Sequence, residues 1–200
     1  MLPFIGEEEL ERHKEYQRSE ALMLSVEEKK YPKYSSLTIP GLLRMSYRMP
    51  EISRLLALRA SVKLHDVYFS SFGAGEYRRS RVARDLFGSE TAMLSELYRL
   101  GERIECGFVG VGMSGSSTLF LFSVGYTSGH KASAISPSTK RSTKQGVYRL
   151  EYPAELFSIG DPILAVDLYE HAYFDGYSFD KERYLASALS HLRIDALDNL

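Results

Sequence analysis

The chain has 200 residues, a formal net charge of −1 and 44% hydrophobic residues. This apolar content is enough to bury a substantial core, in one large domain or two small ones. The near-zero charge gives no bulk electrostatic basis for binding nucleic acid or an anionic membrane. The single cysteine, Cys106, excludes an internal disulfide and a cysteine-based zinc site.

The apolar runs of the chain are short, and charged residues begin close to its N-terminus. Glu7, Glu8 and Glu9 leave no room for the apolar core of a signal peptide. The longest apolar runs, such as residues 119–122, are far too short to span a bilayer. We therefore expect a cytoplasmic protein with no membrane and no nucleic-acid partner.

Helical patterns dominate the first part of the chain. Residues 7–30 contain no glycine or proline, and the glutamates at their start suit the positive end of a helix dipole. Three prolines make residues 31–50 a connection, with a short helix at residues 41–47. Residues 51–72 carry the strongest helical pattern, and a turn over residues 73–81 follows it.

Later in the chain the helical patterns give way to β-like ones. Two more helices are predicted, over residues 82–87 and 90–105. Beyond them, β-branched and aromatic residues predict strands at 108–112, 118–126, 147–152 and 162–167. A polar, basic stretch over residues 127–146 is expected to form a mobile hairpin tip. A helix over residues 181–192 ends the pattern.

This order of elements predicts an α+β fold in two parts. An antiparallel helical hairpin would occupy residues 1–73. An α/β domain with a small, about three-stranded antiparallel sheet would occupy residues 74–200. The glycines at residues 110–115 do not form a phosphate-binding loop, because no GK[ST] follows and no helix succeeds the strand.

Three histidines and one aspartate are candidates for chemistry. Taken alone, His13 lies on a charged helix, where a surface histidine is the usual interpretation. His65 lies among apolar and aromatic residues on one helix face, where a hydrogen-bonded core histidine is commoner than a ligand. Asp167 and His171 follow an apolar run, and a metal, an Asp–His hydrogen bond or a helix cap would each satisfy them.

Several stretches resemble the iron/manganese superoxide dismutases. Residues 167–174 read DLYEHAYF, which resembles that family's signature D-x-W-E-H-A-Y-[YF]. Residues 177–185, YSFDKERYL, resemble its Y-x-N-x-R-x-x-Y segment. Residues 4–13, 64–69 and 86–107 are similar to further family segments in the same order, so the resemblance covers nearly the whole chain.

The resemblance implies that His13, His65, Asp167 and His171 are the catalytic residues and hold one Fe or Mn ion per chain. Three neutral imidazoles and one carboxylate suit a redox-active first-row ion that cycles between its +3 and +2 states. The implied activity is that of an oxidoreductase that dismutates superoxide to dioxygen and hydrogen peroxide. Glu170 would cross a homodimer interface to the metal-bound histidine of the second subunit.

Around the implied ligands the chain departs from the family pattern. Gln17 stands in place of a channel histidine, Ala21 in place of a gateway tyrosine, and Ser61 in place of the glutamine of iron-type members. Phe69 and Tyr169 stand in place of the tryptophans that wall the family's metal pocket, and Phe174 in place of the tyrosine that hydrogen-bonds the channel histidine.

Three hypotheses stay open: a divergent dismutase, a metal-binding homologue with weak or different activity, and a structural or interaction protein. A two-histidine, one-carboxylate oxygenase is disfavoured, because four protein ligands leave too few open coordination positions.

Overall fold

The structure is a computed structural model that describes residues 4–73, 79–126 and 146–200. The helices are α1 (Glu7–Lys30), α2 (Ile39–Ser46), α3 (Ser53–Ser70), α4 (Arg81–Phe87), α5 (Glu90–Glu102), α6 (Pro153–Ile159), α7 (Phe174–Tyr177) and α8 (Lys181–Ser190). The strands are β1 (Cys106–Ser114), β2 (Leu119–Tyr126), β3 (Val147–Leu150) and β4 (Gly160–Asp167). The 3-10 helices are η1 (Pro32–Tyr34), η2 (Pro50–Ile52), η3 (Glu170–Ala172) and η4 (Ile194–Asn199).

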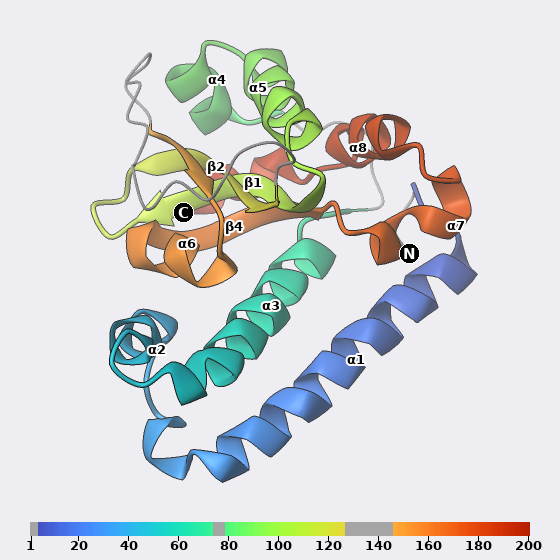
Figure 1. The fold of residues 1–200 in the computed structure, drawn as a ribbon. Helices are drawn as coiled ribbons and strands as arrows, with labels where there is room; N and C mark the ends of the chain where they lie inside the picture. Colours follow the sequence, from blue (N-terminus) through green and yellow to red (C-terminus); the bar gives the residue numbers. More distant parts are fainter. Residues whose placement is uncertain (1–3, 74–78, 127–145) are drawn as a thin grey trace.

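The predicted α+β class is confirmed. Helices α1 and α3 run antiparallel on one side of the sheet, while α4, α5 and α8 lie on the other (Figure 1). Within the described residues, no helix combines the length and the apolar character needed to cross a lipid bilayer. The hairpin tip expected at residues 127–146 lies outside the described residues except for Gly146. The division of the chain into residues 1–73 and 74–200 stays a prediction.

The sheet differs from the expected one in strand number and in strand direction. It has four strands in the order β3-β2-β1-β4. Strand β1 pairs antiparallel with both β2 and β4, but β3 pairs parallel with β2. The prediction of an antiparallel sheet of about three strands was therefore wrong for β3. A parallel pair needs a long connection, and residues 127–146 are long enough to supply it, whereas side-chain alternation does not encode strand direction.

Helix α6, between β3 and β4, was not predicted. Pro153 occupies its first position, and the Glu155 side chain accepts a hydrogen bond from the Tyr152 backbone N–H at 3.3 Å. Proline at the first position and glutamate at the third are start signals of a helix. The strand expected at residues 147–152 consequently ends earlier, at Leu150.

Ser71, just beyond the end of α3, links that helix to β4 through hydrogen bonds. The backbone N–H of Ala165 donates a hydrogen bond to Ser71 Oγ at 2.8 Å, and Ser71 Oγ donates to the Val67 carbonyl oxygen at 2.7 Å. The Arg193 backbone N–H donates to the Ser71 carbonyl oxygen at 2.8 Å. Ser71 is fully buried, so these bonds are shielded from water. They hold α3 in a fixed position along β4.

Gly110 lies where β1 and β4 approach too closely for a side chain. It faces Ala165 across the strand pair, and a Cβ at this position would lie 2.0 Å from the Leu164 carbonyl oxygen. We expect Gly110→Ala to lower the free energy of unfolding by about 1–3 kcal/mol, measured by urea denaturation. Gly115→Ala is the matched control, because its Cβ would meet no atom within 4 Å. Equal losses in the two variants would contradict this account.

Candidate metal centre

Four side chains from separate segments meet beside the end of the sheet. His13 comes from α1, His65 from α3, Asp167 from the last position of β4 and His171 from η3. One potential ligand atom of each lies within 4.8 Å of the others. The structure thus brings together all four residues that the sequence analysis selected. His13 and Asp167 are fully buried, whereas the His171 side chain remains 22% exposed.

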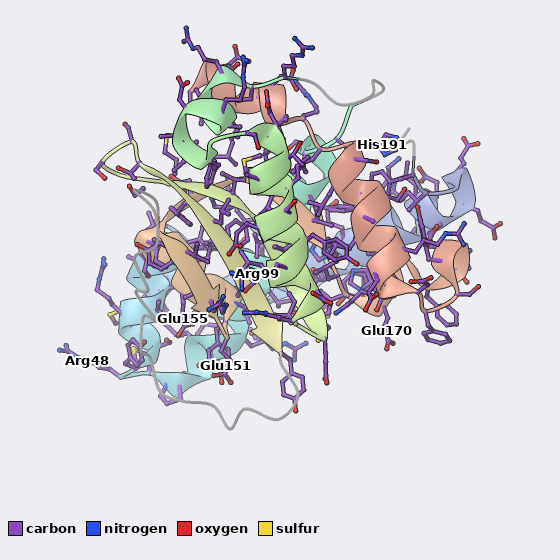
Figure 2. The ribbon with its side chains drawn as sticks, turned by 90° about the horizontal axis from the view of Figure 1, so that it is seen from above. Arg48, Arg99, Glu151, Glu155, Glu170 and His191 are labelled. Atoms are coloured by element: carbon purple, nitrogen blue, oxygen red, sulfur yellow. The ribbon has the colours of Figure 1, made fainter. Side chains whose placement is uncertain are left out.

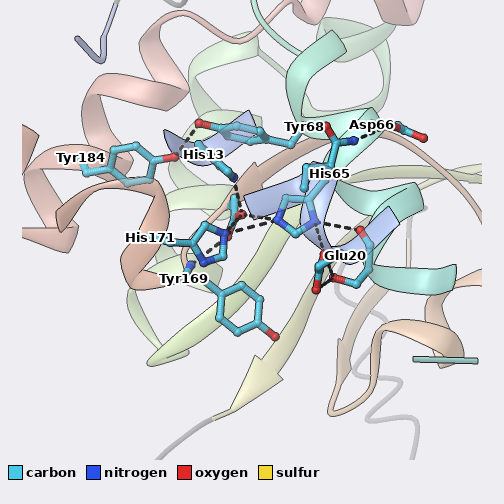
Figure 3. A network of polar contacts seen from close by, with 11 residues as sticks. His13, Glu20, His65, Asp66, Tyr68, Tyr169, His171 and Tyr184 are labelled. Atoms are coloured by element: carbon cyan, nitrogen blue, oxygen red, sulfur yellow. Dashed lines mark hydrogen bonds and ion pairs between the residues drawn. The ribbon is translucent and has the colours of Figure 1, made fainter. Parts of the chain in front are cut away.

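Three imidazole nitrogens converge on a single carboxylate oxygen (Figure 3). The Nε2 atoms of His13 and His171 each lie 3.1 Å from Asp167 Oδ2. The Nε2 atom of His65 lies 3.2 Å from the same oxygen and 3.3 Å from His171 Nε2. The other oxygen, Asp167 Oδ1, accepts a hydrogen bond from the Tyr169 backbone N–H at 2.8 Å, which fixes the carboxylate.

The contacts of His65 indicate which of its nitrogens carries the proton. Its Nδ1 lies 3.0 Å from the Ser61 carbonyl oxygen, which can only accept, so Nδ1 is assigned as the donor. In the neutral ring, Nε2 then directs a lone pair at Asp167 Oδ2, and two acceptors face each other. A proton on Nε2, or a cation shared by the ring and the carboxylate, removes this repulsion.

The pKa values of the cluster reflect burial and mutual hydrogen bonding. Burial alone would lower the pKa of His65, but hydrogen bonds with Asp167 and Glu20 outweigh it and raise this pKa to about 10. Burial lowers the pKa of His13. Burial would raise the pKa of Asp167, but hydrogen bonds from the three histidines hold it well below its usual range. Asp167 is therefore ionised at neutral pH and carries a charge that can attract a cation.

The donor set fits a first-row transition-metal ion. Imidazole nitrogen and carboxylate oxygen are ligands that Fe and Mn accept. A cation among the four atoms would replace the proton between His65 Nε2 and Asp167 Oδ2 with bonds to both atoms. The N–H of a ligand histidine that faces away from its metal usually has a hydrogen-bond acceptor, and His65 has one in the Ser61 carbonyl. The corresponding atom of His13, Nδ1, is buried and has no such partner among the described residues.

Aromatic rings enclose the cluster. Those in contact with its histidines are Tyr16, Tyr68, Phe69, Phe108 and Tyr169. The Phe69 ring lies 4.9 Å from that of His13, and the Tyr169 ring stacks on His171 with 5.7 Å between centroids. The resemblance had aligned these last two positions with the tryptophans of the metal pocket. The rings limit the access of water to the four ligand atoms.

Two neighbours of the cluster, Tyr16 and Glu20, were missed by the sequence analysis. The Tyr16 ring stacks on His171 with 4.0 Å between centroids, and Glu20 Oε2 lies 3.3 Å from His65 Nδ1. Burial raises the pKa of Tyr16, and the charge of Glu20 raises it further. Both residues share the helix face of His13, because they follow it by three and seven positions. That spacing is the signal that could have identified them.

The residues that the resemblance aligned with the substrate channel are partly or largely exposed. Gln17 donates a hydrogen bond to Asp66 at 2.6 Å, and Ala21 is exposed. Phe174 is 43% exposed. Glu170 is also exposed and lies at the edge of the molecule (Figure 2). The surroundings of the cluster on α1 are therefore built from Tyr16 and Glu20.

Comparison with known families places this geometry in context. The family model described as "Iron/manganese superoxide dismutases, C-terminal domain" matches residues 135–199, a segment that contains Asp167, Glu170 and His171. A search of curated proteins found no significant match. The match over residues 135–199 supports membership of the iron/manganese superoxide dismutase family.

Proposed function

We propose that the chain binds one Fe or Mn ion through His13, His65, Asp167 and His171 and dismutates superoxide. The observation that carries this proposal is the convergence of three Nε2 atoms and one carboxylate oxygen within 4.8 Å of one another. The ionised state of Asp167 and the 3.2 Å approach of its Oδ2 to His65 Nε2 support it. When bound, the ion would supply a one-electron couple between its +3 and +2 states.

The proposed reaction converts two superoxide ions and two protons into dioxygen and hydrogen peroxide. In it, the protein holds four donor atoms in fixed directions and keeps bulk water away from them. The Tyr169 backbone N–H orients Asp167, and the Ser61 carbonyl orients His65. His171 is the most exposed of the four proposed ligands, so we place the entrance for a small anion beside it.

We further propose a homodimer in which Glu170 contacts the partner's His171. Glu170 is exposed and adjacent in sequence to a proposed ligand. A carboxylate that accepts the N–H of a metal-bound histidine orients the ring and increases its basicity. Dimer formation would then affect the metal centre directly.

A second candidate function is metal binding without dismutation. It is favoured by the placement of Gln17, which pairs with Asp66, and of Ala21, which is exposed. Neither side chain takes the role in substrate entry or proton transfer that the resemblance implies for its position. A purely structural or interaction role ranks third, because it gives no reason for four ligand atoms to converge.

Purified protein is expected to contain stoichiometric Fe or Mn by elemental analysis, and His171→Ala is expected to lose it. The substitution removes one of the four donor atoms and opens the site to water. His191→Ala is the matched control, because its Nδ1 lies 2.9 Å from the Ser187 carbonyl oxygen on α8, outside the cluster. Metal retained by His171→Ala would refute the ligand assignment.

Metal-loaded protein is expected to dismutate superoxide in a stopped-flow assay. Asp167→Asn should lower that activity by more than about 100-fold, because it removes the charge on which the three imidazoles converge. Asp66→Asn serves as the control, since Asp66 is an exposed carboxylate next in sequence to His65. Stoichiometric metal without activity in the wild-type protein would favour the second candidate function.

Glu170→Ala is expected to shift the protein from dimer to monomer in sedimentation velocity, because it removes the proposed contact between subunits. Glu151→Ala is the control, since Glu151 is also exposed and lies well apart from Glu170 in Figure 2. A wild-type monomer, or an unchanged dimer in Glu170→Ala, would count against this interface.

A further inference from the structure

Glu20 is a second buried carboxylate beside the cluster, and it lies outside the proposed ligand set. Only 7% of the residue is exposed. Its Oε2 lies 3.3 Å from His65 Nδ1, and the Ser61 hydroxyl lies 3.0 and 2.8 Å from its two oxygens. Figure 3 shows Glu20 on the side of the His65 ring that faces away from His171. His65 is thus held between two carboxylates, Asp167 at Nε2 and Glu20 at Nδ1.

The burial of Glu20 needs a physical explanation. An ionised carboxylate removed from water is costly unless it is paired and hydrogen-bonded. Among the described residues, the ion-pair contact of Glu20 is with His65, and no lysine or arginine contributes one. The Ser61 hydroxyl also donates to it, and Tyr16 contributes a further side-chain hydrogen bond. His65 and Ser61 both belong to α3, one turn apart, so these two interactions of the buried charge are directed at the helix turn that carries His65.

Glu20 cannot reach the four ligand atoms in this arrangement without leaving its partners. The two nitrogens of an imidazole lie on different edges of the ring, and Glu20 contacts the edge outside the cluster. Its effect on an ion must therefore pass through His65. A carboxylate at the outer N–H of a ligand histidine fixes the tautomer and increases the electron donation of the other nitrogen.

We propose that Glu20 is a positioning residue that holds His65 as a donor to the metal and favours the +3 over the +2 state of the ion. This inference rests on the proposed function, because it requires an ion in the four-residue cluster. A nearby negative charge stabilises the more positive ion more strongly, and the low exposure of the site limits screening. Ser61 assists by orienting the carboxylate.

The test compares metal-loaded wild-type protein with Glu20→Gln, which keeps the side-chain shape and one acceptor oxygen but removes the charge. The midpoint potential of the ion, measured by redox titration, is expected to become more positive. The affinity of metal-free protein for Mn²⁺, measured by chelator competition, is expected to fall about tenfold or more. Neither readout depends on activity, and a purely structural role of Glu20 would leave the potential unchanged.

Glu27→Gln is the matched control for the charge change. Glu27 is also a buried carboxylate on α1, but it pairs with Lys30 and Arg54. Its substitution should leave the potential and the Mn²⁺ affinity as they are in the wild-type protein. A shift of the same size in Glu27→Gln would overturn a specific role for Glu20.

The outcomes separate this inference from the proposed function. An unchanged potential and Mn²⁺ affinity in Glu20→Gln, in a protein whose wild type binds metal, would overturn the inference alone. A wild-type protein that binds no metal would overturn both. If Glu20→Gln does not fold, Ser61→Ala decides, because it removes the hydroxyl that orients Glu20 and keeps the carbonyl that contacts His65. A positive shift of the midpoint potential in Ser61→Ala, smaller than the shift expected for Glu20→Gln, supports the positioning role of Glu20. An unchanged potential in Ser61→Ala overturns it.

Discussion

The contact of Asp167 with three imidazoles is the constraint on which the arrangement of the chain depends. A fully buried carboxylate is costly unless every lone pair finds a partner, so α1, α3 and η3 must dock together for β4 to end where it does. The remaining contacts support this meeting point. Ser71 sets the position of α3 along β4, and the close approach of β1 at Gly110 sets the position of β4 in the sheet.

The sequence predicted the main elements because their patterns are local. His65 could be placed on a buried face, since apolar residues surround it at helical spacing. His13 could not, because α1 is largely charged and its histidine is buried only by contacts with segments far away in sequence. The orientation of β3 and the existence of α6 were missed for different reasons. Alternation does not encode strand direction, whereas the Pro153 and Glu155 signal was present and overlooked.

The immediate surroundings of the cluster could be predicted only in part. A position-by-position comparison with the family led to Gln17 and Ala21, four and eight residues after His13. The structure instead places Tyr16 and Glu20 there, three and seven residues after it. Both sets lie within one broad helix face, and the choice between them depends on the neighbouring helix. The hydroxyl that accommodates Glu20 belongs to Ser61 on α3, and no pattern within α1 encodes it.

The separation of the four residues along the chain has a consequence for biosynthesis. His13 and Asp167 are 154 positions apart. A nascent chain that has emerged only as far as α5 therefore carries His13 and His65 but lacks Asp167 and His171. Domains that are synthesised first can fold first, but this cluster cannot close until the last strand and η3 have emerged. Contacts between such distant residues also slow folding. If the cluster binds a metal as proposed, capture would therefore be a late event, which follows the emergence of η3.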